Sequence, residues 1–358
     1  MPTRAETNLR AAALRAAFER SGAALVEPPI LQPAATLLDL YGEDIRARAY
    51  VTSDALRGEQ MLRPDFTVPV VQMHMESGAD AARYTYAGEV FRRQEEDPQR
   101  ANEYVQVGYE VFDRGDPAFA DAEVFALISD ALADVRVGAI TGDIGILVAA
   151  VKDLHTSAAR KAALLRHIWR PQRFRRLLEL FARRGIATRE RQALLAGATQ
   201  ITAPIIGRRT VAEVQARIAA LRADAHTDPI SDEQVALIEA LLNVHGTLPQ
   251  ALRQLRDLAS QMPTLSQAVD RLQAREHALS ARGIATETLV FEASYGRTTL
   301  EYYDGFVFGF RSTEHPEVPI LASGGRYDAL TKQLGQGREI PAVGGVIRPG
   351  ILLALETG

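Results

Sequence analysis

Polar side chains at alternate positions make one pair of predicted strands the part of the chain best suited to bind a small molecule. On the second strand, Gln106 and Glu110 flank Gly108 at two-residue spacing. On the first strand, Arg92 follows Gly88 by four residues. Because side chains alternate across a strand, the members of each set share one face. Burying an arginine, an amide and a carboxylate is costly unless each finds a partner, and a small zwitterion could supply several. These residues favour an amino-acid pocket. A polar patch whose groups satisfy one another, or an edge strand kept soluble by charge, also fits them.

The strands that carry these side chains are predicted to form an antiparallel pair. Residues 84–93 and 103–112 are the two strands, and the polar segment 95–99 between them is typical of a turn.

A second polar pair lies upstream, in the segment 62–69. Asp65 and Thr67 stand two residues apart between Pro64 and Pro69, and would face the same side if the segment were extended. An Asx or Ser/Thr turn between the prolines is the other interpretation.

Composition limits the classes of function that the chain can have. With 358 residues, 47% of them hydrophobic and 24% charged, the chain can bury a large core, as one domain with an insertion or as two domains. The absence of cysteine excludes disulfides, thiolate metal sites and a cysteine nucleophile. A net charge of -4 argues against broad affinity for nucleic acid. With no signal peptide and no long apolar span, we expect a cytoplasmic protein that does not enter the membrane.

Motifs of several enzyme classes are missing from the sequence. No two of the seven histidines are four residues apart, so there is no zinc-binding His-x-x-x-His helix. A phosphate loop, a nucleophile elbow and a dinucleotide fingerprint are also absent. We therefore expect no metal and no cofactor.

The chain is predicted to be an α+β protein whose core is interrupted by helices. Residues 1–150 form the first part of the core, 151–285 form a mostly helical insertion, and 286–358 complete the core. Within the first part, the apolar segment 138–148 is predicted to be a buried strand, and residues 300–310 in the last part alternate like another.

The start of the predicted insertion is rich in basic residues. Such runs are commonly solvated helix faces. The more specific interpretation is a binding surface for an acidic partner or for RNA. The basic residues are Arg160, Lys161, Arg166, Arg170, Arg173, Arg175, Arg176, Arg183 and Arg184.

The strand pair also carries a family resemblance. Phe91-Arg92-Arg93, a charged loop with Arg100, and Gln106-Val107-Gly108-Tyr109-Glu110 resemble motif 2 of class II aminoacyl-tRNA synthetases, in the form found in histidyl-tRNA synthetases. Two further segments, 301–305 and 323–328, resemble the histidine-specific signatures of the same family. The helix at 6–20 and the prolines after it resemble motif 1, which forms the dimer interface in that family.

The resemblance implies a fold and a set of ligand-binding residues. The fold is an antiparallel sheet flanked by helices. Asp65 and Thr67 would hold the amino group of a bound histidine, Arg92 would meet its carboxylate, and Glu110 with two tyrosines would surround its imidazole. The complete implied histidine-binding set is Asp65, Thr67, Arg92, Gln106, Glu110, Tyr303 and Tyr327.

The sequence departs from the synthetase pattern where that family activates its amino acid. Thr298 stands where an arginine is expected, with Arg297 one residue out of register. Ile351 stands at the arginine position of motif 3, with Arg348 three residues away. No anticodon-binding domain is expected after the core. Because adenylate formation needs positioned cations, these losses should abolish activation.

A histidine pocket without catalytic cations resembles the regulatory subunits of ATP phosphoribosyltransferase, which are paralogues of the synthetases. This resemblance implies a non-catalytic homodimer that joins the short catalytic subunit at the first step of histidine biosynthesis, with L-histidine as feedback effector and no tRNA partner. The alternative is a truncated synthetase-like enzyme that activates histidine with ATP.

Overall fold

The computed structural model describes residues 2–41, 48–94, 101–182, 188–197, 207, 209–297 and 302–357. Several residues singled out in the sequence lie outside these ranges: the turn at 95–99, Arg100, Arg183, Arg184 and Thr298.

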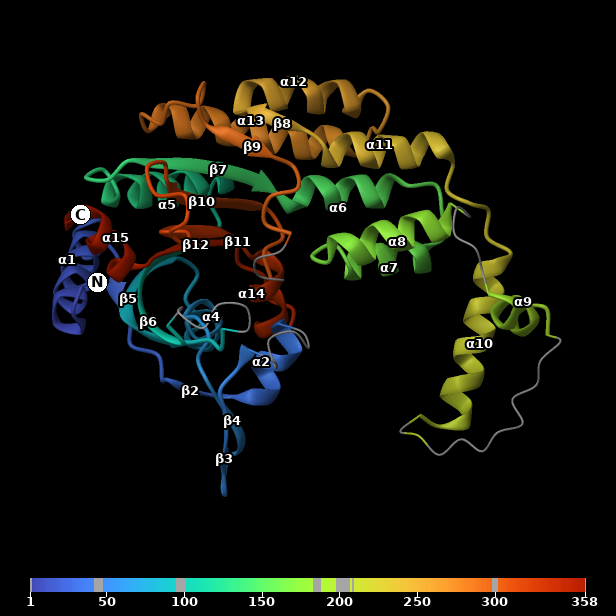
Figure 1. Ribbon diagram of the computed structural model, residues 1–358, viewed down its shortest axis with the longest axis horizontal. Helices are drawn as coiled ribbons and strands as arrows, with labels where there is room; N and C mark the ends of the chain where they lie inside the picture. The colour runs from blue at the N-terminus through green and yellow to red at the C-terminus, as the bar shows by residue number, and fades with distance from the viewer. Residues whose placement is uncertain are drawn as a thin grey trace.

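A large mixed sheet forms the centre of the molecule (Figure 1). Its strands are β1 (Ala24–Leu25), β5 (Ala82–Phe91), β6 (Glu103–Phe112), β7 (Val137–Asp143), β8 (His245–Thr247), β9 (Val290–Glu292), β10 (Phe306–Ser312), β11 (Ala322–Arg326) and β12 (Ala342–Ile347). Their order across the sheet is β1-β5-β6-β12-β11-β10-β7-β9-β8. Neighbours pair antiparallel except β1 with β5 and β7 with β9. With the helices around it, this sheet confirms the predicted α+β class.

The predicted strand pair is confirmed as β5 and β6. The two strands run antiparallel, with Gly88 opposite Gln106 and Tyr84 opposite Glu110. Residues opposite one another in a ladder lie on the same face of the sheet, so Gly88, Gln106 and Glu110 share one face, as predicted. The first strand ends at Phe91, so Arg92 lies just beyond the strand that was predicted to carry it.

Two other strand predictions were wrong in their bounds. β7 ends at Asp143, whose side chain accepts a hydrogen bond from the Gly145 N–H at 2.8 Å and begins helix α6 (Ile144–Asp153). The continuous apolar run hid this boundary because buried strands and buried helices share the same composition. β10 begins at Phe306, later than the alternation from residue 300 suggested.

Helices cover the face of the sheet opposite the polar residues (Figure 1). In α5 (Pro117–Ala131), Phe125 packs against Phe306, Phe308 and Phe310, with ring centroids 5.0–6.3 Å apart. α1 (Arg4–Arg20) packs against β5 and β6, and α15 (Pro349–Thr357) packs against α1 and β6. The alternating phenylalanines of β10 thus build the core on this face.

The predicted helical insertion is divided between the core and an outlying group. β8 joins the main sheet, and α13 (Leu265–Ala281) packs on α5 and α6. Its Arg275 is buried and bonds the carboxylates of Asp121 at 2.7 Å and Asp143 at 2.8 Å. Between α6 and β8 the helices are α7 (Ala158–Arg166), α8 (Pro171–Phe181), α9 (Arg189–Leu195), α10 (Val211–Ala225) and α11 (Asp232–Leu242), and α12 (Leu248–Ala259) precedes α13. In Figure 1, α9 and α10 project away from the sheet.

One member of the basic run is structural. Arg160 of α7 is 4% exposed and donates to the Asp224 carboxylate at 2.6 Å and to the backbone carbonyl of Asp228 at 2.8 Å. This arginine therefore anchors α7 and does not contribute to a basic surface.

Smaller elements complete the fold. β2 (Leu31–Pro33), β3 (Val51–Asp54) and β4 (Gly58–Leu62) form a small sheet in the order β2-β4-β3. The remaining helices are α2 (Ala34–Tyr41), α4 (Thr67–Ser77) and α14 (Asp328–Leu334). Among the described helices, none combines the length and the apolar character needed to cross a membrane.

Candidate functional site

Glycines on one face of the main sheet make room for the large side chains that surround a cavity. Gly344 lies opposite both Glu110 and Gly325, so these residues share the face that carries the predicted polar residues. Following the ladder across the sheet places six glycines on this face, where the missing side chains lower its surface. They are Gly88, Gly108, Gly344, Gly325, Gly309 and Gly142, each on a different strand from β5 to β7.

Large side chains pass directly over these glycines. A Cβ at Gly325 would lie 2.7 Å from the ring of Tyr303, and a Cβ at Gly344 would overlap the Glu110 carboxylate. Glycine is therefore required here by close approach of neighbouring side chains.

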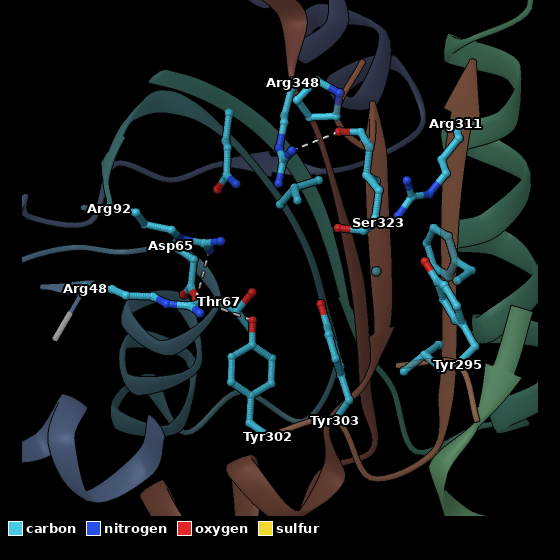
Figure 2. A pocket seen from close by; sticks show the side chains of 17 residues that line it. Arg48, Asp65, Thr67, Arg92, Tyr295, Tyr302, Tyr303, Arg311, Ser323 and Arg348 are labelled. Carbon is cyan, nitrogen blue, oxygen red and sulfur yellow. Dashed lines mark hydrogen bonds and ion pairs between the residues drawn. The ribbon is translucent and has the colours of Figure 1, made fainter. Parts of the chain in front are cut away.

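A cavity of about 330 Å³ lies on this face, bordered by β6, β10, β11 and β12 (Figure 2). Its volume is near the lower end of the range of about 300–1,000 Å³ that is usual for small-molecule sites. Five of the seven predicted residues line it: Asp65, Thr67, Arg92, Gln106 and Tyr303.

Asp65 and Thr67 meet at the cavity, but not because their segment is extended. Thr67 is the first residue of α4, so the premise of an extended segment was wrong. The chain turns into a helix between the two residues, and Pro69 is tolerated because it falls in the first turn. The Asp65 carboxylate lies 3.8 Å from the Arg92 guanidinium and accepts a hydrogen bond from the Tyr302 hydroxyl at 3.5 Å.

Arg92 is held in place by the backbone. Its Nε donates to the carbonyl of Pro64 at 2.7 Å. This bond and the nearby Asp65 keep the guanidinium at the side of the cavity where Figure 2 shows Asp65 and Thr67.

Gln106 has an unsatisfied polar atom at the cavity wall. The side chain is 1% exposed, and its Oε1 has no hydrogen-bond partner in the described part of the chain. A buried acceptor of this kind costs free energy until a donor reaches it.

Glu110 and Tyr327 lie behind the cavity wall and do not line it. The Glu110 carboxylate accepts hydrogen bonds from three hydroxyls: Tyr327 at 2.5 Å, Tyr86 at 2.7 Å and Thr67 at 3.1 Å. Burial raises the pKa of Glu110 to about 7, opposed by these hydrogen bonds and assisted by the charge of Asp65. Burial also raises the pKa values of Tyr86 and Tyr327. Thr67 connects this buried network to the cavity.

Several residues of the cavity wall were not predicted from the sequence. Arg311 and Ser323 were not predicted, and Arg348 was considered only as a displaced catalytic residue. Arg311 follows Val307 and Gly309 at two-residue spacing on β10, so strand alternation could have identified it. The other polar and aromatic residues of the wall that were not predicted there are Arg48, Tyr295, Tyr302 and Phe308.

Arg297 and Arg348, which lie close in sequence to the catalytic arginine positions of the synthetase family, differ in their location relative to the cavity. Arg297 points away from the cavity: it is 4% exposed, its Nε donates to the carbonyl of Ile168 at 2.8 Å, and its guanidinium lies over Phe174. Arg348 lines the cavity, donates to the carbonyl of Ile320 at 3.0 Å and lies over the ring of Tyr104. The next residue, Pro349, is the first residue of α15.

The fold and this site define a class II histidyl-tRNA synthetase-like protein. The sequence matches the family model described as histidyl-tRNA synthetase over residues 2–216 and 208–349. Among solved structures, an ATP phosphoribosyltransferase regulatory subunit/histidyl-tRNA synthetase from Bacillus halodurans aligns with a TM-score of 0.65 and 20% identity, covering 100% of this chain and 81% of that chain. A histidyl-tRNA synthetase from Nostoc aligns with a TM-score of 0.64 and 17% identity, over 97% of this chain and 70% of that chain. At these identities the two structures establish the fold.

Curated relatives narrow the assignment. An ATP phosphoribosyltransferase regulatory subunit from Brucella anthropi is 33% identical over 361 residues, which cover 92% of this chain and 93% of the relative. The corresponding protein from Brucella ovis is 31% identical, over 93% of both chains. The chain belongs to the family of ATP phosphoribosyltransferase regulatory subunits.

Proposed function

We propose that this chain is the cytoplasmic, non-catalytic regulatory subunit of an ATP phosphoribosyltransferase and that it binds L-histidine in the cavity. The proposed site keeps the residues predicted from the sequence: Asp65, Thr67, Arg92, Gln106 and Tyr303 at the cavity wall, and Glu110 and Tyr327 behind it.

The unpartnered Oε1 of Gln106 carries the ligand assignment. This buried acceptor needs a donor, and both the ammonium group and the imidazole N–H of histidine are donors. The Asp65 carboxylate on the same cavity supplies the opposite charge for an ammonium group. Arginines of the wall supply cations for the carboxylate, and Arg92, whose guanidinium lies 3.8 Å from the Asp65 carboxylate, is the candidate predicted from the sequence.

Glu110 and Tyr327 act through Thr67 in this proposal. The three hydroxyls that donate to Glu110 fix the carboxylate, and the carboxylate in turn fixes the Thr67 hydroxyl at the wall. Substitution of Glu110 or Tyr327 should therefore weaken histidine binding without removing a direct contact.

Regulation requires that histidine bind two states of an assembly with different affinity, because only differential binding shifts an equilibrium. The proposed assembly contains the short catalytic subunit and a homodimer of this chain, without tRNA. The helix α1, which resembles motif 1, presents Leu9 with 75% of its surface exposed, which supports a homodimer contact there.

The ligand assignment is tested by isothermal titration calorimetry with L-histidine. Hydrogen bonds to charged groups contribute about 1.5–3 kcal/mol, so Asp65→Asn and Gln106→Leu should weaken binding by roughly 10- to 100-fold. Asp134→Asn, at an exposed position, is the matched control. Unchanged affinity in both cavity variants, with native circular dichroism, would refute the site.

The regulatory assignment is tested with the purified short catalytic subunit. Size-exclusion chromatography with light scattering should show a hetero-oligomer, and histidine should inhibit the complex. The complex made with Asp65→Asn should assemble and lose sensitivity to histidine at concentrations that inhibit the wild-type complex. A chain that binds histidine but neither assembles nor confers inhibition would contradict the regulatory role.

A catalytic alternative rests on Arg92 and Arg348, which both line the cavity and could neutralise negative charge in adenylate formation. It is tested by histidine-dependent exchange between ATP and pyrophosphate, beside an authentic histidyl-tRNA synthetase. Exchange above background that disappears in Arg348→Gln would replace the non-catalytic assignment with an activating enzyme.

A further inference from the structure

The turn that follows strand β9 lies over the sheet face that carries the cavity. β9 ends at Glu292, and the Tyr295 N–H donates a hydrogen bond to the Glu292 carbonyl at 3.0 Å, which closes the turn. The next residue, Gly296, has a φ of 88° and lies so close to the sheet that a Cβ there would be 2.7 Å from the Val307 side chain. Because Val307 lines the cavity, the turn reaches the edge of the cavity.

Tyr295, within this turn, occupies the space that two glycines of the sheet leave open. Gly142 of β7 lies opposite Val307 of β10, and Gly309 follows Val307 by two residues, so all three share one face. A Cβ at Gly142 would lie 3.0 Å from the Cβ of Tyr295, and a Cβ at Gly309 would overlap the Tyr295 hydroxyl. The side chain of Tyr295 therefore lies along the sheet from β7 to β10 and covers both glycines, neither of which lines the cavity.

Tyr295 itself forms part of the cavity wall. Figure 2 shows it on the same side as Arg311, across the cavity from Asp65. Burial raises the pKa of Tyr295, and the positive charge of Arg311 opposes this shift. The phenol is therefore neutral at physiological pH, and it restricts the cavity by its volume and not by charge.

The ring of Tyr295 keeps the cavity small on this side. With a shorter side chain at position 295, the cavity would extend over Gly309 and toward Gly142, since neither glycine has a side chain to fill the space. The volume of about 330 Å³ lies near the lower end of the range of small-molecule sites, about 300–1,000 Å³. Specificity depends on the ligands that a site excludes as well as on those that it binds, so a side chain that limits this volume selects among ligands.

We propose that Tyr295 is a specificity-determining residue, which admits an amino acid of the size of free histidine and excludes a histidine that carries an additional ring. The proposal rests on the proposed histidine site and adds a steric limit to it. Gly309 is the second part of this limit, because only glycine leaves room for the Tyr295 hydroxyl against the sheet.

Isothermal titration calorimetry with two enlarged ligands tests the steric limit. With the ammonium group at Asp65, either the imidazole or the carboxylate faces Tyr295, so the ligands are Nτ-benzyl-L-histidine and L-histidine benzylamide. Tyr295→Ala should bind one of them at least tenfold more tightly than wild type does, since a pocket discriminates by about 10- to 200-fold on a single methylene. Tyr295→Phe keeps the ring and should not show this gain.

A second set of variants tests the contact with Gly309 while the ring stays in place. Gly309→Ala places a methyl group where the Tyr295 hydroxyl lies, which should push the ring into the cavity and weaken histidine binding by about tenfold. Adding Tyr295→Phe removes the hydroxyl and leaves the ring carbon Cζ 3.3 Å from the methyl position, so the affinity should recover. Gly207→Ala is the matched control, because no described atom lies within 4 Å of the added methyl group.

The outcomes separate the steric limit from the proposed function. If wild type does not bind L-histidine, the proposed function fails and the steric limit fails with it. If wild type binds L-histidine and Tyr295→Ala gains affinity for neither derivative, or Tyr295→Phe gains as much, only the steric limit is overturned. If Tyr295→Ala does not fold, the variants of Gly309 decide: equal weakening of histidine binding with and without the Tyr295 hydroxyl overturns the steric limit.

Discussion

Two buried groups, Glu110 on β6 and His74 on α4, are expected to give the stability of this protein opposite dependences on pH. Glu110 has its pKa raised from 4.5 to about 7, mainly by burial. His74 of α4 is fully buried, stacks on Phe112 at 4.0 Å, and has its pKa lowered from 6.5 to about 4, also mainly by burial. Both shifts mean that the folded chain favours the neutral form of each group.

The signs follow from proton linkage. The folded chain binds the Glu110 proton more tightly than the unfolded chain does, so this group's contribution to stability is complete below about pH 4.5 and is lost as the pH rises through about 7. For His74 the unfolded chain binds the proton more tightly, so its contribution is complete above about pH 6.5 and is lost as the pH falls through about 4. At 1.36 kcal/mol for each pKa unit, each group contributes on the order of 3 kcal/mol.

The assay is urea unfolding between pH 4 and 8, comparing each variant with wild type at every pH. The unfolding free energy of Glu110→Gln should rise relative to wild type by about 3 kcal/mol between pH 4.5 and 7.5, because the variant has no charge to bury. The unfolding free energy of His74→Leu, relative to that of wild type at the same pH, should fall by about 3 kcal/mol as the pH rises from 4 to 6.5. Glu76→Gln, exposed on α4, is the matched surface control. If the difference in unfolding free energy between variant and wild type did not change with pH, or changed in the same direction for both variants, the reasoning would be refuted.

Two further predictions concern packing and buried charge. Gly344→Ala places a methyl group where the Glu110 carboxylate lies, and should lower the unfolding free energy by about 1–3 kcal/mol in urea titrations; an unchanged midpoint would mean that the carboxylate moves at no cost. Arg275→Leu leaves the carboxylates of Asp121 and Asp143 without this partner and should cost about 3–5 kcal/mol in the same assay. A loss below 1 kcal/mol would show that water compensates for the missing guanidinium.

Strand alternation made the site partly predictable from the sequence. The sequence predicts the pairing of β5 with β6. Because side chains alternate along a strand with a period of two residues, it also predicts that Gln106 and Glu110 share one face. The packing face of Phe306, Phe308 and Phe310 follows from the same rule, and Phe125 confirms it.

Other features depend on contacts that local sequence does not encode. Asp65 and Thr67 reach the cavity although the chain becomes helical between them, since the fold and not the local conformation brings them there. The position of Glu110 behind the wall is set by donors far apart in sequence, including Tyr327. Likewise, only the folded chain shows that Arg297 packs on Phe174.

The six glycines of this sheet face have a consequence for the energetics of ligand binding. Two of the side chains that lie over them, Tyr303 over Gly325 and Tyr295 over Gly309, line the cavity. Because these rings lie directly on the hydrogen-bonded main chain of the sheet, they have little room to change rotamer. A ligand that contacts them therefore does not have to immobilise flexible side chains there, and that entropic cost is not subtracted from its affinity. The empty site should keep this part of its shape.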